Sequence, residues 1–361
     1  MRSPLPPSVR PSPSRIVWLA RFAGRAVALF CALAPMVATA CAPDRKEVVV
    51  YLTLDLEHAQ SILDDFEKAT GVHVRAISDN EITKTVALAN KIILDKEHQK
   101  GDVFWNNEIV NTIRVKRAGC IEPYRSPSAA DIPDRFKDKD GAWTGFAARA
   151  RVFIVNTQKC PAEWTPESYL DYVDPARKGE WAIAKPIAGT TASHLAVLFH
   201  ALGEEKAKEW WTKLVGNQAG LLSGNGPVMK EVRAGTFLYG FTDTDDYFVA
   251  ATDGYPVIAV YPDQKDGEIG CLVIPNTISL LKGAPSPDLG RRFIDYVLSR
   301  DVEKKLAFGS SAQIPVRDDV EAPPHVKRIK DLRLMNADFE AAAAEFEVAQ
   351  EWLTRPGNLG R

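Results

Sequence analysis

The sequence lacks an excess of basic residues: 45 lysines and arginines face 47 aspartates and glutamates, for a net charge of −2. This balance excludes the strongly basic surface by which proteins hold nucleic acids. No short repeat period is visible, which excludes collagen-like and coiled-coil chains. Apolar residues make up 45% of the chain and charged residues 25%, the composition of a folded soluble protein. A length of 361 residues predicts two domains.

Sequence signatures of common enzymes are also missing. There is no G-x-x-x-x-G-K-[ST] phosphate loop, no H-E-x-x-H and no G-x-S-x-G. Gly224-Asn225-Gly226 is not followed by the third glycine of a dinucleotide-binding loop. These absences favour a binding protein over an enzyme, and no cofactor is expected. The histidines are scattered and predict no metal or catalytic cluster: His58, His73, His98, His194, His200 and His325.

The first forty residues have the pattern of an export signal. They contain five arginines and no acidic residue. The apolar run at 26–34 is too short for a bilayer of about 30 Å. Pro35 and the small residues Ala38-Thr39-Ala40 follow it. We therefore expect a signal peptide over 1–40 and a periplasmic protein, with a buried core helix as the alternative.

The cysteines raise two separate questions. Cys41 directly follows the small residues and resembles the lipidated cysteine of bacterial lipoproteins, although Ala38 stands where leucine is usual. This predicts a lipid anchor, the only expected membrane contact, with plain cleavage before Cys41 as the alternative. Cys120, Cys160 and Cys271 remain. One pair could form a disulfide in an oxidising compartment, or all three could be small buried residues.

Strand and helix patterns alternate along the rest of the chain. Glu47 to Leu52 is a β-branched run, and the apolar residues of 55–70 lie on one helix face before Gly71. Such alternation predicts an α/β fold of mostly parallel sheets flanked by helices. Further strands are predicted at 72–76, 102–105, 152–155, 181–184, 236–241, 272–274 and 278–281. Further helices are predicted at 83–96, 193–202, 205–214, 289–298, 302–308 and 336–353.

Two segments have the form of ligand sites, since ligands of α/β folds lie beyond the carboxyl ends of strands. The first runs from Lys185 to Ser193, after a strand and at the start of a helix. Gly189 allows close backbone approach, and helix N-termini favour anions. Simple N-capping is the alternative. The hydroxyl groups of this segment belong to Thr190, Thr191 and Ser193.

The second segment runs from Phe241 to Tyr247 and contains Asp243, Asp245 and Asp246. A helix start needs only one such cap, so three carboxylates within four residues predict a site for a metal ion or a ligand ammonium. A solvated helix start is the alternative.

Longer stretches resemble the periplasmic ferric-ion-binding proteins of ABC importers, within the type II periplasmic-binding-protein family. The likeness extends over nearly all of 47–320, and the order and spacing of its pieces are its specific feature. The pieces are YLTLDLEHAQSILDDFEKATGVHV at 51–74, GDVFWNNEI at 101–109, GCIEPY at 119–124, FAARARVFIVNT at 146–157, KPIAGTT at 185–191 and FIDYVLSRDVEKKLA at 293–307.

The resemblance implies two lobes with a ligand cleft between them, closing by a hinge. One lobe is expected from 45–147 plus 270–315, and the other from 148–269 plus 316–361. It also implies docking on a membrane permease that is driven by an ATPase.

The ligand residues of that family do not carry over. Its ferric-binding members use two adjacent tyrosines, often with a histidine and a glutamate. Those positions align with Thr244-Asp245, Asp55 and Asn107, and the chain contains no Tyr-Tyr pair. The anion side of the family aligns with the turn at 188–190 and with Asn225.

We therefore expect an organic anion or zwitterion as the ligand. Its anionic end would lie at Gly189, Thr190, Thr191 and Ser193, with Asn225 nearby. Its amine or hydroxyl end would face Asp243, Asp245 and Asp55, and Thr244 belongs to the same turn. Further cleft candidates are Asn106, Asn107 and Arg149, although either Arg149 or Arg151 could be a purely structural ion-pair member.

Two alternatives stay open. A metal reading places Fe³⁺ or a divalent ion among Asp55, Asp243, Asp245 and Tyr247. A secreted hydrolase with paired carboxylates would need an apolar pocket that raises one pKa.

Overall fold

The computed structural model describes residues 46–78 and 84–360. The chain divides into two units, 1–44 and 45–361, and every described helix and strand belongs to the second. The predicted signal peptide and Cys41 lie outside the described residues. Within the described ranges, no helix has the length and apolar character needed to cross a membrane.

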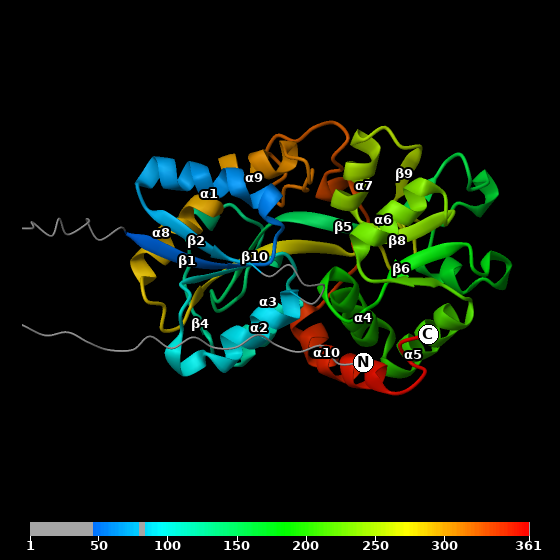
Figure 1. Cartoon of the computed structure of the whole chain (residues 1–361), viewed down its shortest axis with the longest axis horizontal. Coiled ribbons are helices and arrows are strands. Elements are labelled where there is room, and N and C mark those ends of the chain that lie inside the picture. The colour runs from blue at the N-terminus through cyan, green and yellow to red at the C-terminus, as the bar shows by residue number, and fades with distance from the viewer. Residues whose placement is uncertain (1–45, 79–83, 361) are drawn as a thin grey trace, which may run out of the picture. The chain divides into compact units, whose positions relative to one another are not determined.

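Within the described residues, ten strands form one continuous curled sheet, and eight of them follow the order β2-β1-β3-β10-β5-β8-β6-β7 (Figure 1). Of the remaining two, β4 pairs with β10 and β9 with β5. The strands are β1 (Glu47–Leu52), β2 (His73–Ile77), β3 (Val103–Asn106), β4 (Ile121–Glu122), β5 (Thr144–Asn156), β6 (Trp181–Ala184), β7 (Gly220–Leu222), β8 (Tyr239–Asp243), β9 (Val257–Val260) and β10 (Val273–Leu281).

Two groups of parallel strands are joined by long antiparallel strands. Strands β1, β2 and β3 are parallel to one another, as are β6, β7 and β8. Residues 144–150 of β5 pair with β10, and residues 151–155 pair with β8. All thirteen residues of β5 are buried. Strand β5 therefore passes from one parallel group to the other.

Strand β10 corrects one prediction, because the segments at 272–274 and 278–281 are parts of one strand. Its register on β5 shifts between Pro275 and Asn276. In the sequence, the residues at 275–277 (Pro-Asn-Thr) interrupt the apolar pattern. Strand β8 begins later than predicted and continues to Asp243. Asp243 is therefore the last residue of β8, at the carboxyl end of that strand.

In the part of the chain that the structure describes, ten α-helices cover the two faces of the sheet (Figure 1). Helix α1 buries Ala59, Ile62 and Phe66, and it ends at Gly71, whose φ of 69° suits glycine. The helices are α1 (Leu56–Thr70), α2 (Lys84–Leu94), α3 (Val110–Arg117), α4 (Gly189–Leu202), α5 (Glu204–Gly216), α6 (Asn225–Ala234), α7 (Thr244–Thr252), α8 (Pro287–Val297), α9 (Arg300–Phe308) and α10 (Phe339–Thr354).

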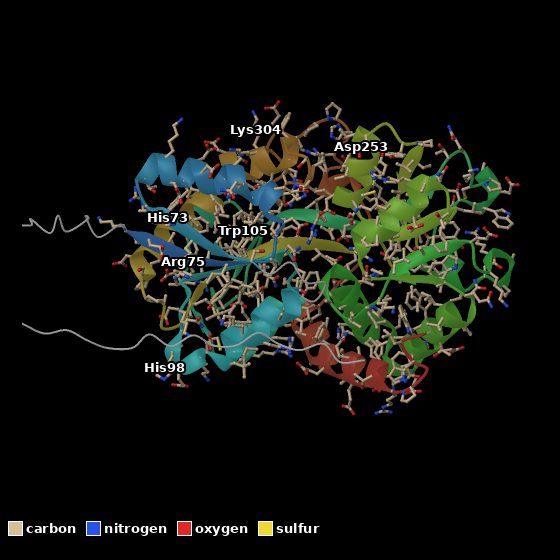
Figure 2. All side chains as sticks on the ribbon, viewed as in Figure 1. His73, Arg75, His98, Trp105, Asp253 and Lys304 are labelled. Atoms are coloured by element: carbon tan, nitrogen blue, oxygen red, sulfur yellow. The ribbon has the colours of Figure 1, made fainter. Side chains whose placement is uncertain are left out.

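Large aromatic side chains fill the interior beside both groups of parallel strands. Trp105 at the end of β3 is fully buried and lies 5.5 Å from the ring of Phe146 (Figure 2). In the other strand group, the ring of Phe153 lies 5.0 Å from Tyr172 and 5.2 Å from Phe241. These rings hold the strand ends in fixed positions, because close-packed side chains resist displacement.

Two of the histidines and the three remaining cysteines can be located in the structure. His73 on β2 and His98 after α2 lie well apart (Figure 2). Cys120, Cys160 and Cys271 are each free and buried. The three form no disulfide with one another and behave as small core residues.

Candidate functional site

A pocket of about 330 Å³ lies where five helices begin: α1, α2, α4, α6 and α7. Ligand pockets of proteins usually measure about 300–1,000 Å³, so this one suits a small solute. Helices α4, α6 and α7 follow the parallel strands β6, β7 and β8 directly. The lining residues are Leu54, Asp55, His58, Thr85, Asn107, Arg149, Gly189, Thr190, Gly224, Asn225, Gly226, Asp243, Asp245 and Asp246.

Helices α4 and α6 offer backbone N–H groups to the pocket. Neither helix has a side-chain cap at its N-terminus, so first-turn N–H groups keep their hydrogen-bonding capacity. There are two exceptions: the N–H of Gly189 donates to Thr85 Oγ1 at 3.1 Å, and Pro227 in the first turn of α6 has no N–H. Gly189 has a φ of 62°, a left-handed conformation that glycine adopts at low cost. The helix dipoles make this wall favourable for an anion.

The side chains beside these helix starts are bonded to one another. Thr190 Oγ1 donates to Asp243 Oδ2 at 2.6 Å and accepts from Asn225 Nδ2 at 2.9 Å. Arg151 Nη1 donates to Asp243 Oδ1 at 2.8 Å, and its Nη2 donates to Thr191 Oγ1 at 3.1 Å. The hydroxyl hydrogen of Thr190 is thus already used, so an anion on this wall would meet backbone N–H groups.

Four of the residues expected to bind the organic solute lie outside the pocket lining. Ser193 Oγ donates to the buried Glu108 at 2.6 Å, and Asn106 Nδ2 donates to the same carboxylate at 3.0 Å. Thr191 is bonded to Arg151, as described above, and Thr244 Oγ1 accepts from a β5 backbone N–H at 3.2 Å. These four side chains point into the protein interior, where their hydrogen bonds hold the pocket-lining segments in place.

Three carboxylates gather at the start of α7. Oxygen atoms of Asp243, Asp245 and Asp246 all lie within 4.8 Å of one another. Thr242 Oγ1 donates to Asp246 at 2.7 Å. From the sequence, Asp246 is named only as one of three clustered acids. In the structure it also lines the pocket, because consecutive residues of a first helical turn can both face a cleft.

Burial and the neighbouring charges together determine the pKa values of these three carboxyl groups. Burial works against ionisation of Asp243, but the guanidinium groups of Arg151 and Arg149 outweigh it and lower its pKa. Burial raises the pKa of Asp245, with Asp243 adding to the rise and Arg149 opposing it. Burial and the charges of Asp245 and Asp243 hold the pKa of Asp246 well above its ordinary value.

The two arginines of β5 have different positions. Arg151 is fully buried, pairs with Asp243 at 2.8 Å and stacks over Phe241 at 4.5 Å. Arg149 lines the pocket, with Nη1 at 3.6 Å from Asp243 and 3.5 Å from Asp245. Arg151 is thus the structural ion-pair member, and Arg149 is the cation that a ligand can meet.

The opposite wall comes from the other strand group. Asp55 precedes α1, His58 lies in its first turn, Thr85 lies in the first turn of α2, and Asn107 follows β3. The backbone N–H of Asn107 donates to Thr53 Oγ1 at 2.7 Å. Asp55 and Asn107 were expected here from the sequence, whereas His58 and Thr85 were not, because no motif marks them.

Tyr247 lies outside the pocket, although the metal hypothesis included it. It is half-buried against apolar neighbours, with its ring 5.0 Å from that of Phe248, and burial raises its pKa. Two helical positions separate it from Asp245, which turns the side chain by about 200°. No tyrosine lines the pocket within the described ranges.

Known proteins resemble the chain over most of its length. The profile of the bacterial extracellular solute-binding proteins matches residues 61–334. A Serratia marcescens protein named Fe(3+)-binding periplasmic protein is 25% identical over 318 residues, covering 86% of this chain and 90% of its own length.

Two further proteins are similar over most of their length. A Salmonella typhimurium protein, provisionally named as a 2-aminoethylphosphonate-binding periplasmic protein, is 25% identical over 335 residues, covering 89% of this chain and 91% of its own. Iron-bound HitA from Pseudomonas aeruginosa has a TM-score of 0.77 and 22% identity, covering 85% of this chain and 98% of HitA.

Proposed function

The chain belongs to the bacterial extracellular solute-binding protein family, and from this we propose that its pocket captures a small organic zwitterion or anion. The family match and the HitA likeness confirm the resemblance and the type II fold expected from the sequence. The relatives are named for different solutes, one for Fe³⁺ and another for an aminophosphonate. The ligand must therefore be argued from this pocket.

The observation that carries the proposal is the presence of two unlike kinds of group in one pocket. The uncapped starts of α4 and α6 present N–H groups, which suit a phosphonate, phosphate or carboxylate. Asp245 and Asp246 present carboxylates at the start of α7, which suit an ammonium or hydroxyl group. A solute with both kinds of group finds a partner for each.

The charges in the pocket also favour such a solute. Asp243 is paired with Arg151, and Asp245 lies 3.5 Å from Arg149. The pKa of Asp246 is raised by burial and by its acidic neighbours. Arginines thus already compensate two of the lining carboxylates, and a solute of small net charge disturbs these ion pairs least.

A metal ion is the second candidate, because three carboxylates lie within 4.8 Å of one another. Oxygen ligands of this kind suit Fe³⁺ or a hard divalent ion. Against it, both arginines already compensate the cluster, and the described lining contains no tyrosine. The organic solute remains our leading proposal.

The cellular role follows from the family. We propose that the lobes comprise 45–147 plus 270–315 and 148–269 plus 316–361, and that they close on the solute. The closed form would deliver it to an ABC permease and its ATPase from the periplasm, and a lipid on Cys41 would anchor the protein to the membrane. No catalytic residue or resident cofactor enters this proposal.

Calorimetric titration with 2-aminoethylphosphonate as the probe tests the proposal. Ethylphosphonate lacks its ammonium, ethanolamine lacks its phosphonate, and ferric citrate represents the metal. We expect the whole zwitterion to bind more tightly than either half, and to stabilise the protein by about 2.7 kcal/mol at roughly 100 times its Kd. Binding of ferric citrate alone, among these four, would reject the organic solute. Unchanged ³¹P spectra after long incubation would separate binding from hydrolysis.

A further inference from the structure

Arg149 stands at the place that a metal ion would need. Its Nη1 lies 3.6 Å from Asp243 Oδ2 and 3.5 Å from Asp245 Oδ2. Its Nη2 donates to the backbone carbonyl of Asn107 on the opposite wall. The residue is 4% exposed. The guanidinium is therefore held between the two walls, directly beside the acidic cluster.

We infer that Arg149 determines the specificity of the pocket: it is a fixed internal cation that excludes metal ions from the carboxylates of Asp243, Asp245 and Asp246. This inference deepens the proposed function, because it explains how a pocket with three clustered acids accepts an organic solute instead of a metal.

Charge is the first reason. Hard metal ions lie about 2.0–2.6 Å from carboxylate oxygens, so an ion bound to Asp243 and Asp245 would lie close to Nη1 of Arg149. The repulsion grows in proportion to the charge of the incoming ion. It is therefore two or three times larger for a divalent or trivalent metal than for an ammonium group at the same place.

The second reason is that Arg149 keeps its positive charge and its position. Burial works against the charge of Arg149, but Asp245, Asp243 and Asp246 outweigh it and raise its pKa further. An arginine so placed does not lose its proton. The side chain projects from β5, whose neighbouring strands are β10 and β8, so the backbone that carries it is fixed as well. Its Nε is buried without a hydrogen-bond partner in the described part of the chain.

Ligand supply is the third reason. A metal needs several oxygen ligands at once, yet Asp243 already accepts from Arg151, Thr190 and Asn225. Within the pocket this leaves Asp245 and Asp246 as the cluster's less occupied acids. An ammonium needs only one or two such acceptors.

The test uses Arg149→Gln, which removes the charge and keeps a donor for the carbonyl of Asn107. The probe is Mn²⁺, whose binding is followed by electron paramagnetic resonance and by metal analysis after dialysis. We expect the wild type to stay metal-free and R149Q to bind Mn²⁺ at least about tenfold more tightly. The matched control Arg149→Lys keeps the charge and should stay metal-free. The double variant R149Q/D245N should lose the gain.

Each outcome decides the inference. Stoichiometric Mn²⁺ on the wild type, or a folded R149Q that gains no Mn²⁺, would overturn it. If R149Q unfolds without metal, recovery of its thermal transition in Mn²⁺ would support the inference, and failure to recover would count against it. If the wild type does not bind 2-aminoethylphosphonate, the proposed solute is rejected. The inference about Arg149 is unaffected by that outcome, because the Mn²⁺ comparison needs no organic ligand.

Discussion

Replacement of Asp245 by asparagine should weaken binding of a zwitterion and spare binding of a plain anion. The Asp245 side chain is 17% exposed and lies 3.5 Å from Arg149, so an ammonium bound there would be largely removed from water. A hydrogen bond between charged groups in such a place contributes about 1.5–3 kcal/mol. Because each 1.4 kcal/mol is about a tenfold change, D245N should bind 2-aminoethylphosphonate about 10- to 150-fold more weakly.

The comparison with ethylphosphonate isolates the ammonium contact. Calorimetric titration of both ligands with both proteins gives a thermodynamic cycle, in which the coupling belongs to the ammonium and the carboxylate. Ethylphosphonate should bind D245N as well as it binds the wild type, or more tightly, because a negative charge has been removed. An equal loss for both ligands would refute the reasoning, since it would mean that Asp245 acts on the pocket as a whole.

Three further changes test the walls of the pocket. Gly189→Ala should lower the free energy of unfolding by about 1–2 kcal/mol, because alanine is strained in the left-handed conformation, and it should weaken anion binding. Nothing lies within 4 Å of the added methyl group, so backbone strain is the expected cause. An unchanged urea denaturation curve would contradict this argument. Ser193→Ala removes a 2.6 Å hydrogen bond to buried Glu108 and should cost about 1.5–3 kcal/mol in urea denaturation; a neutral result would show that the remaining donors suffice. The raised pKa of Asp246 means that the native state binds more protons than the unfolded state above pH 3.8 or so, and its stability falls as pH rises through the native pKa. Asp246→Asn should therefore be more stable than the wild type at neutral pH and show a flatter pH profile, and parallel profiles would contradict this.

Strong apolar patterns made much of the fold predictable. The strands at 47–52 and 181–184 have the predicted bounds. Two of the missed elements carry weak or misleading patterns. Strand β7 has only three residues, and α6 opens with Asn225-Gly226-Pro227, which is typical of a turn. Proline is nevertheless compatible with a first helical turn, because the N–H it lacks would have no partner inside the helix.

The site was predictable only where helix starts could be located. The segments around Gly189 and Asp245 follow recognisable strands, and the structure brings both to one pocket. Side-chain direction was not predictable from spacing. Thr191 and Ser193 turn into internal hydrogen bonds, whereas Asp246 reaches the pocket. Such choices depend on partners such as Arg151 and Glu108, which lie far away in the sequence.

The position of the captured solute is the central claim, and a crystal structure of the protein with 2-aminoethylphosphonate tests it most directly. We expect phosphonate oxygens within hydrogen-bonding distance of first-turn N–H groups of α4 and α6, and the ammonium against Asp245 and Asp246. A reversed ligand, a ligand outside this pocket, or a metal ion among the three carboxylates would contradict the claim.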